Sequence, residues 1–108
     1  MRLLLDEFVP ARLRVALPAH DVVTVVQMGW SGLKNGKLLA FASSQFDAFV
    51  TVDKNLPYQQ DSANLPIAVV VLDSVSNELP RLLPLVPALE VALGRLAPCS
   101  FVLVRAEA

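Results

Sequence analysis

Residues 3–7 read LLLDE, an apolar run that ends on two adjacent carboxylates. Three successive leucines favour a strand that is buried on both faces, as in a parallel sheet covered by helices on each side. A carboxylate next to such a strand is costly to bury, so it is solvated, paired with a cation or used to hold a metal ion. The rest of the chain must decide among these roles for Asp6 and Glu7.

Four further apolar runs have the same character and lie at residues 21–25, 48–52, 67–72 and 100–104. Helical patterns separate the runs, at residues 10–17, 36–45 and 78–96. This alternation predicts an α/β protein with a three-layer, Rossmann-like fold and a mostly parallel sheet of about five strands. The polar, proline-flanked segment 55–66 predicts a loop.

Prolines set the expected helix ends. The first helix should begin near Pro10 and end by residue 17, because a proline disfavours helical geometry in the residue before it. The second should begin at residue 35 or 36. We expect it to bury Leu38, Leu39, Phe41 and Ala42. Three prolines in the last region predict a broken approach to a helix at about 87–96.

The 108 residues fit a single domain, 1–108, with one core. The chain is 55% hydrophobic, yet no apolar run approaches the roughly 18–20 residues that a membrane span needs. The apolar excess therefore predicts a large core, an oligomer surface such as that of a homodimer, or both. The start of the chain lacks the pattern of a signal peptide, which makes the cytoplasm the expected location.

Charge gives no general attraction for nucleic acid. The formal net charge is −1 and no run of lysines or arginines is present. Arg2, Arg12 and Arg14 make a local basic patch only if the first helix presents them together, and no stripe of aromatic and basic residues for reading bases is visible. The single cysteine excludes an intrachain disulfide. A nucleic-acid partner is neither implied nor excluded at this point.

Three of the apolar runs end at an aspartate: Asp6, Asp53 and Asp73. Ligands of open parallel sheets collect at the carboxyl ends of the strands, so neighbouring strands would bring these acids together. Converging carboxylates suit Mg²⁺ or Mn²⁺, which can activate water for phosphodiester cleavage. Glu7 can support such a site, and Lys54 can contact a phosphate. The alternative is that each aspartate caps a helix or starts a turn.

Residues 3–13 (LLLDEFVPARL), 20–32 (HDVVTVVQMGWSG) and 49–56 (FVTVDKNL) resemble the small single-domain PIN-like proteins, relatives of the PIN-domain toxin ribonucleases of the VapC type. The resemblance implies a Rossmann-like sheet, an acidic Mg²⁺ or Mn²⁺ site, hydrolysis of RNA and, often, a toxin neutralised by a small antitoxin. By position, it implies that Asp6 and Asp53 are the catalytic acids and metal ligands. Asp73 is a further candidate metal ligand because it also ends an apolar run.

The resemblance fails at residues 34–37, where KNGK replaces the acidic cluster usual in relatives. Asn35 offers a neutral oxygen, but Lys37 cannot replace a carboxylate. Fewer negative ligands predict weaker divalent binding. Catalysis is then weak, dependent on Asp73, or lost.

Two other functions are compatible with the same residues. One is a degenerate PIN-like module that binds a protein or RNA without cutting it. The other, ranked lower, is a phosphoacceptor receiver domain with Asp53 as the phosphorylated residue and Ser74 as the switch hydroxyl. Against the receiver, Arg105 stands where a lysine is expected, and arginine poorly replaces a compact ammonium group.

Overall fold

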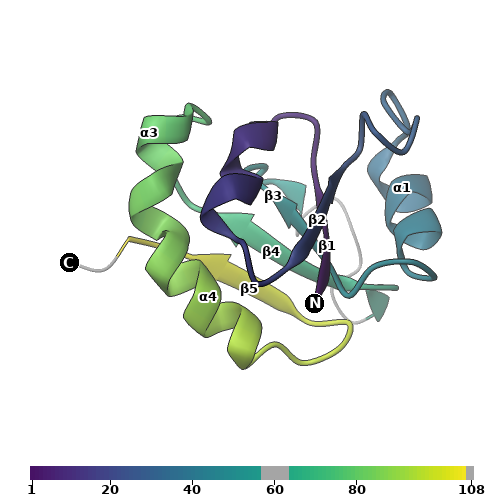
Figure 1. Ribbon diagram of the computed structural model, residues 1–108. Coiled ribbons are helices and arrows are strands. Elements are labelled where there is room, and N and C mark those ends of the chain that lie inside the picture. The colour runs from purple at the N-terminus through teal and green to yellow at the C-terminus, as the bar shows by residue number, and fades with distance from the viewer. Residues whose placement is uncertain (57–63, 107–108) are drawn as a thin grey trace.

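The computed structural model describes residues 1–56 and 64–106, and its centre is a five-stranded sheet (Figure 1). All four strand pairs are parallel, in the order β2-β1-β3-β4-β5. The strands are β1 (Arg2–Leu5), β2 (Asp21–Thr24), β3 (Ala48–Thr51), β4 (Ala68–Leu72) and β5 (Phe101–Val104). The five predicted strands and the α/β fold class are confirmed. Most of the predicted loop at 55–66 lies outside the described residues.

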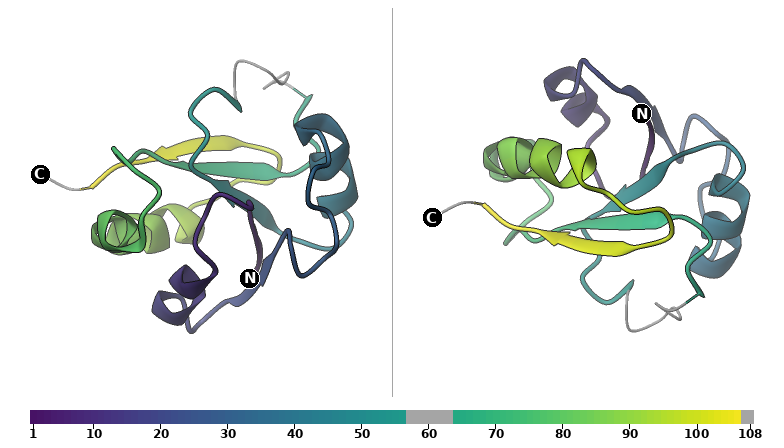
Figure 2. Two further views of the ribbon diagram at one scale, coloured as in Figure 1. Left: turned by 90° about the horizontal axis from the view of Figure 1, so that it is seen from above. Right: turned by 90° about the horizontal axis from the view of Figure 1, so that it is seen from below.

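Helices cover both faces of the sheet, which gives three layers (Figure 2). Leu3 and Leu5 of β1 point into a core shared with Leu13 of η1 (Ala11–Ala16) and with the helices before β5. Leu4 points the other way, into a core shared with Leu39 of α1 (Asn35–Ala42). Alternate residues of a strand face opposite sides, so one continuous run of leucines serves both cores.

The first helix occupies the expected place, between Pro10 and Leu17, but it is a 3₁₀ helix. The second begins at Asn35 as predicted and buries Leu38, Leu39 and Ala42. The expectation that Phe41 is buried was wrong, since it is 43% exposed. The buried positions 38, 39 and 42 form the stripe that faces the sheet, and residue 41 falls beside this stripe, where its ring contacts Trp30 at 5.9 Å.

The last helical region is broken, as its prolines predicted. It consists of α3 (Leu79–Leu82), η3 (Leu83–Leu85) and α4 (Val86–Gly94). Each piece has a proline in its first turn, where the missing N–H group is tolerated best. Helix α4 begins one residue before the predicted start and ends two residues before the predicted end.

The connection from β2 to α1 crosses the carboxyl edge of the sheet. It turns at Gly29 and Gly32, whose backbone φ angles are +74° and +82°. Residues other than glycine rarely adopt such positive values. Trp30 lies between them and packs on the core, with its ring 6.3 Å from that of Phe46. This path places the start of α1 opposite the ends of β1 and β3. None of the helices in the described residues is long and apolar enough to cross a membrane.

Candidate functional site

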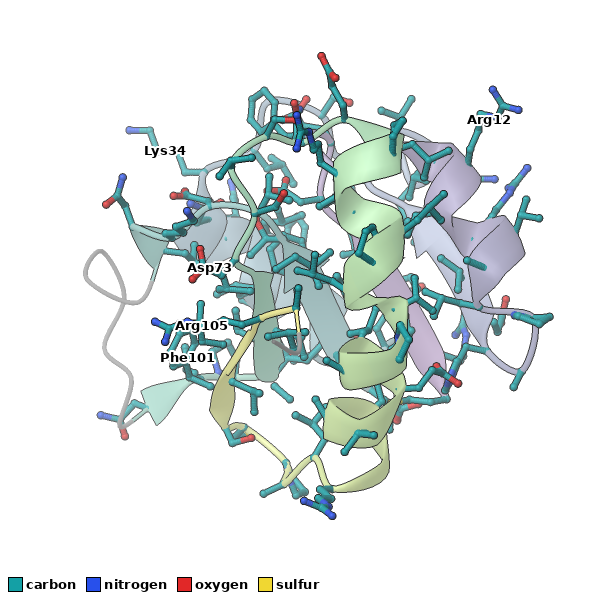
Figure 3. The ribbon with its side chains drawn as sticks, turned by 90° about the vertical axis from the view of Figure 1, so that its left-hand side faces the viewer. Arg12, Lys34, Asp73, Phe101 and Arg105 are labelled. Atoms are coloured by element: carbon teal, nitrogen blue, oxygen red, sulfur yellow. The ribbon has the colours of Figure 1, made fainter. Side chains whose placement is uncertain are left out.

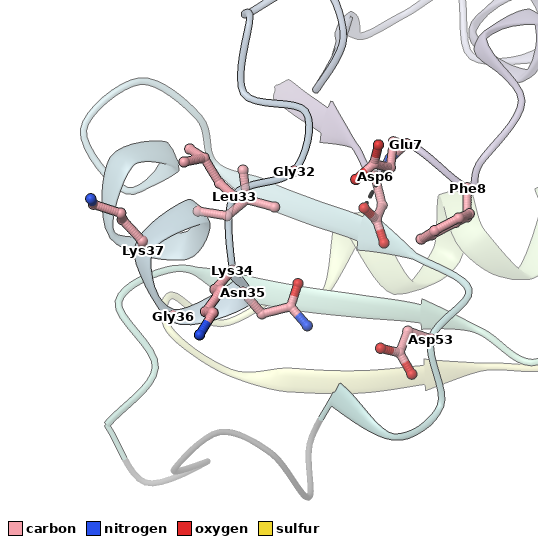
Figure 4. Close-up of a pocket in the computed structure, with 11 residues that line it drawn as sticks. Asp6, Glu7, Phe8, Gly32, Leu33, Lys34, Asn35, Gly36, Lys37 and Asp53 are labelled. Atoms are coloured by element: carbon pink, nitrogen blue, oxygen red, sulfur yellow. Dashed lines mark hydrogen bonds between the residues drawn. The ribbon is translucent and has the colours of Figure 1, made fainter.

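The ends of β1 and β3 open into a cleft of about 1060 Å³ (Figure 4). Asp6 directly follows β1, and Asp53 lies two residues beyond β3. The two strands are neighbours in the sheet, so these acids share one edge. Residues from the start of α1 form the facing wall. The lining comprises Asp6, Glu7, Phe8, Gly32, Leu33, Lys34, Asn35, Gly36, Lys37, Leu38 and Asp53.

Asp6 is held rigidly at the base of this cleft and is only 8% exposed. Its backbone N–H extends the sheet by donating to the Val50 carbonyl at 2.9 Å. Its carboxylate accepts hydrogen bonds from the Thr51 hydroxyl at 2.7 Å and from the Glu7 N–H at 2.8 Å. Burial raises the pKa of Asp6; these two bonds oppose the shift, and the charges of Glu7 and Asp53 add to it.

Thr51 connects the two aspartates. Besides donating to Asp6, its fully buried hydroxyl accepts a hydrogen bond from the Asp53 N–H at 3.1 Å. Asp53 in turn accepts a bond from the Asn55 N–H at 2.9 Å, which closes a tight turn after the strand. The sequence interpretation did not single out Thr51. The available signal was a hydroxyl inside the otherwise apolar run FVTV, two residues before an acid.

The cleft acids lack cationic partners in the part of the chain that the structure describes. No ion pair there involves Asp6, Glu7 or Asp53. On the facing wall, the Asn35 amide extends towards the side of the cleft that carries the two aspartates, whereas the Lys37 side chain extends the opposite way (Figure 4). The lysine is therefore not aimed at the carboxylates, and their negative charge is not neutralised by it.

Asp73 lies outside this cleft, although it follows β4 directly. Its carboxylate pairs with Lys54 Nζ at 2.8 Å. It also pairs with Arg105 Nε at 3.0 Å, and Figure 3 shows Asp73 and Arg105 near one another. The hydrogen bond from Lys54, followed by that from Arg105, lowers the pKa of Asp73. Lys54 is thus engaged by Asp73. The structure brings together two of the three aspartates considered, and over residues 1–56 and 64–106 no three acidic, His or Cys side chains are arranged to hold a metal ion.

Ser74 and Arg105, which the receiver interpretation would need beside Asp53, make contacts outside the cleft. The Ser74 hydroxyl contacts the Arg81 carbonyl at 3.5 Å and accepts from the Ser76 N–H at 3.4 Å. Arg105 is paired with Asp73 rather than with Asp53. Ser74 and Arg105 are not part of the cleft lining.

Asp6 and Asp53 are the carboxylates of the cleft that could hold a Mg²⁺ or Mn²⁺ ion, since Mg²⁺ is commonly bound through one or two carboxylates and retains several waters. Burial raises the pKa of Asp6, and its carboxylate forms no ion pair with any described residue, so a divalent cation bound beside it would favour its charged form. Glu7 and Asn35 carry further oxygen atoms on the cleft wall.

Comparisons of the chain with protein-family models, with curated proteins and with solved structures gave no match. A fold of this class carries many functions, so a function must be argued from the site itself.

Proposed function

We propose that the protein is a metal-dependent ribonuclease of the PIN-like type, which hydrolyses RNA phosphodiester bonds with Mg²⁺ or Mn²⁺. One observation carries this proposal: the buried Asp6 carboxylate is linked through Thr51 to Asp53 at the carboxyl edge of a parallel sheet. These acids have no cationic partner among the described residues, and unpaired carboxylates in such a place lower the stability of the folded protein. A bound cation would explain why the acids are present.

In this proposal the chain's own residues position the reaction. Asp6 and Asp53 would hold the metal ion, with Glu7 and Asn35 as accessory groups on the cleft wall. Thr51 keeps the two aspartates in register, because its hydroxyl is bonded to both residues. A bound Mg²⁺ or Mn²⁺ would supply the positive charge that activates water and stabilises the leaving oxygen.

Metal affinity should be modest for two reasons. Residues 34–37 read KNGK and contribute no carboxylate to the cleft. Asp73 is occupied by Lys54 and Arg105. Fewer charged ligands weaken divalent binding, so phosphates of the bound RNA would have to complete the coordination.

The cellular role is inferred from the resemblance of residues 3–13, 20–32 and 49–56 to toxin ribonucleases. On that basis the protein is a toxin that a small antitoxin-like protein neutralises. The proposed place of action is the cytoplasm, and the apolar composition of the chain favours a homodimer. The exposed apolar side chains, which include Val91, Phe101 and Leu103, support a protein interface.

A non-catalytic binding module is the second candidate. It is favoured because, within the described residues, no third acidic, His or Cys side chain is arranged with Asp6 and Asp53 to hold a metal ion. In that case the cleft would hold RNA or a protein partner without cleavage. The receiver function ranks lower, because Ser74 and Arg105 make other contacts.

The test is thermal unfolding with increasing Mn²⁺, for the wild type and for the Asp6→Asn/Asp53→Asn double variant. Binding to the folded state raises the unfolding temperature, so we expect a shift in the wild type that disappears in the variant. The matched control is Asp21→Asn/Glu78→Gln, which removes the same charge from outside the cleft and should keep the shift. An absent shift in the wild type, or an equal shift in the cleft variant, contradicts the metal site.

Cleavage is then measured on single-stranded RNA for Asp6→Asn and Asp53→Asn separately. The ribonuclease proposal requires that each substitution abolishes cleavage while the protein stays folded. Metal binding without any cleavage by the wild type would favour the binding module. Cleavage retained in both variants would remove the catalytic assignment.

A further inference from the structure

The strand β5 forms one edge of the sheet and has no neighbour on its outer side among the described strands (Figure 1). Its sequence, FVLV, contains no charged residue and no proline. Proteins commonly protect a sheet edge with such residues, because the free backbone groups of an edge can pair with another strand. The opposite edge, β2, begins with the exposed Asp21. Of the two edges, β5 is therefore the one suited to pairing with another chain.

The backbone of β5 directs the polar groups of alternate residues outward. The carbonyl groups of Ser100 and Val104 accept hydrogen bonds from the β4 side of the ladder, at 2.8 Å each. In a parallel ladder, alternate residues of a strand face the same neighbour. The N–H and C=O groups of Phe101 and Leu103 therefore point away from β4, and each of these residues offers one donor and one acceptor to a further strand.

The same two residues carry exposed apolar side chains. Phe101 is 37% exposed and Leu103 is 38% exposed. Their side chains share one face of the sheet, because they are two positions apart, whereas Val102 and Val104 pack against the core on the other face. A strand that pairs with β5 would thus satisfy backbone groups and cover apolar side chains at the same time.

We propose that β5 pairs antiparallel with β5 of a second copy of the chain, so that two five-stranded sheets join into one. A two-fold axis relates the copies and closes the assembly at a dimer. With Val102 on this axis, Phe101 of each copy lies opposite Leu103 of the other. Opposite residues whose backbone groups face each other exchange two hydrogen bonds, so every outward N–H and C=O group of these two residues is paired.

The charges at the end of the strand do not oppose this pairing. Arg105 directly follows β5 and forms an ion pair with Asp73 of its own chain (Figure 3). It lies three positions from Val102. The two copies of Arg105 would be separated by twice that length of strand, roughly 20 Å. This separation exceeds the Debye length of about 8 Å at physiological salt, so their repulsion is screened.

A second copy is favoured as the occupant because this edge is complementary to itself. Outward donors meet outward acceptors, and apolar side chains meet apolar side chains. The inference rests on the homodimer that accompanies the proposed function and names its interface, but it uses no residue of the cleft. Antiparallel pairing places the carboxyl ends of the two sheets on opposite sides of the dimer. Each copy therefore keeps a complete cleft of its own.

The first experiment measures the oligomeric state of the wild-type protein by analytical ultracentrifugation over a range of concentrations. Two four-residue strands make a small interface, so we expect a dimer with a dissociation constant on the order of micromolar. Leu103→Pro removes an outward N–H group, which an edge strand tolerates. This variant should dimerise about ten-fold more weakly than its control, Leu103→Ala, which keeps the N–H group. Thermal unfolding checks that both variants are folded.

The second experiment tests the register by cross-linking. Cys99 is the single cysteine, so Cys99→Ser gives a background without thiols. In this background Val102→Cys should form a disulfide between copies under mild oxidation, because the Cα atoms on the axis are about 4.5 Å apart. Leu103→Cys is the control. Its two Cα atoms would be about 8 Å apart, which is too far for a disulfide.

The interface is overturned if the wild type sediments as a monomer at every concentration, or if Leu103→Pro dimerises as tightly as Leu103→Ala. It is also overturned if Leu103→Cys cross-links and Val102→Cys does not. If Leu103→Pro fails to fold, the cross-linking result decides. A failure of the proposed function is distinguishable: Asp6→Asn/Asp53→Asn should dimerise like the wild type, and Leu103→Pro should keep the Mn²⁺ shift.

Discussion

The Thr51 hydroxyl donates a 2.7 Å hydrogen bond to Oδ2 of Asp6, a residue 45 positions away in the sequence. The same oxygen accepts the N–H of Asp53 at 3.1 Å. A single buried side chain thus links the carboxylate of Asp6 to the backbone of Asp53, the two acids that we assign to the metal ion. The register of β1 beside β3, with Leu5 opposite Val50, brings these groups within reach.

Thr51→Val should therefore damage both folding and metal binding. The substitution keeps the shape of the side chain but leaves a buried oxygen of Asp6 without its donor, which costs about 1–3 kcal/mol. Urea denaturation measures the loss of stability, and the Mn²⁺-dependent shift in unfolding temperature should shrink. Thr51→Ser retains the hydroxyl and is the control. Equal behaviour of the valine and serine variants would show that the hydrogen bond has no such role.

Asp6→Asn should stabilise the metal-free protein at neutral pH. The pKa of Asp6 is raised in the folded state, so the folded protein binds its proton more tightly than the unfolded chain does. Stability then falls as the pH rises from the ordinary value of 3.8 through the raised pKa, and the charged form is the destabilising one. An asparagine has no charge to bury. The difference in the free energy of unfolding between the variant and the wild type should become smaller as the pH is lowered.

The measurement is urea denaturation in a chelator at several pH values from acidic to neutral. Glu78→Gln, an exposed acid outside the cleft, is the control and should show no such dependence. If the Asp6→Asn variant is less stable than the wild type at neutral pH, burial of the charged Asp6 carboxylate is not the unfavourable contribution that we infer.

Asp73→Asn should have the opposite pH dependence. The pKa of Asp73 is lowered by Lys54 and Arg105, so its contribution to stability is present above its ordinary pKa and disappears as the pH falls through the lowered value. The variant should be less stable than the wild type at neutral pH and equal to it in acid. Added salt should reduce the difference, since exposed ion pairs are screened. Arg105→Gln removes only one of the two partners of Asp73, so this variant should lose less stability than Asp73→Asn. A difference that persists in acid would exclude the ion pairs as its cause.

Asn35→Asp should strengthen Mn²⁺ binding. The new carboxylate lines the cleft with Asp6 and Asp53, and it stands in the first turn of α1, where negative charge is favoured. We expect an increase in affinity of about ten-fold, or about 1.4 kcal/mol, measured by calorimetry. Gln45→Glu, which changes the charge equally but away from the cleft, should not affect affinity. If Asn35→Asp does not increase the affinity for Mn²⁺, the hypothesis that the metal site lacks only one carboxylate is contradicted.

Several parts of the candidate site were visible in the sequence. Asp6 and Asp53 were predicted because each follows an apolar run, and strand ends are where parallel sheets bind ligands. Thr51 was missed because threonine is common in strands, so its hydroxyl inside the apolar run FVTV was a weak signal. Phe41 was misplaced because a hydrophobic residue in a helix is buried only when it lies on the stripe that faces the sheet.

By itself, the sequence determined the α/β class and the positions of all five strands, because continuous apolar runs of this length are stable only when both faces are covered. Only the tertiary structure decided the strand order, and with it the surroundings of each acid. The order β2-β1-β3-β4-β5 joins Asp6 to Thr51, while the ends of β3, β4 and β5 gather Lys54, Arg105 and Asp73 into a separate ion-pair group. These contacts link residues that are far apart in the chain, so the packing of the strands selects them and no local pattern encodes them.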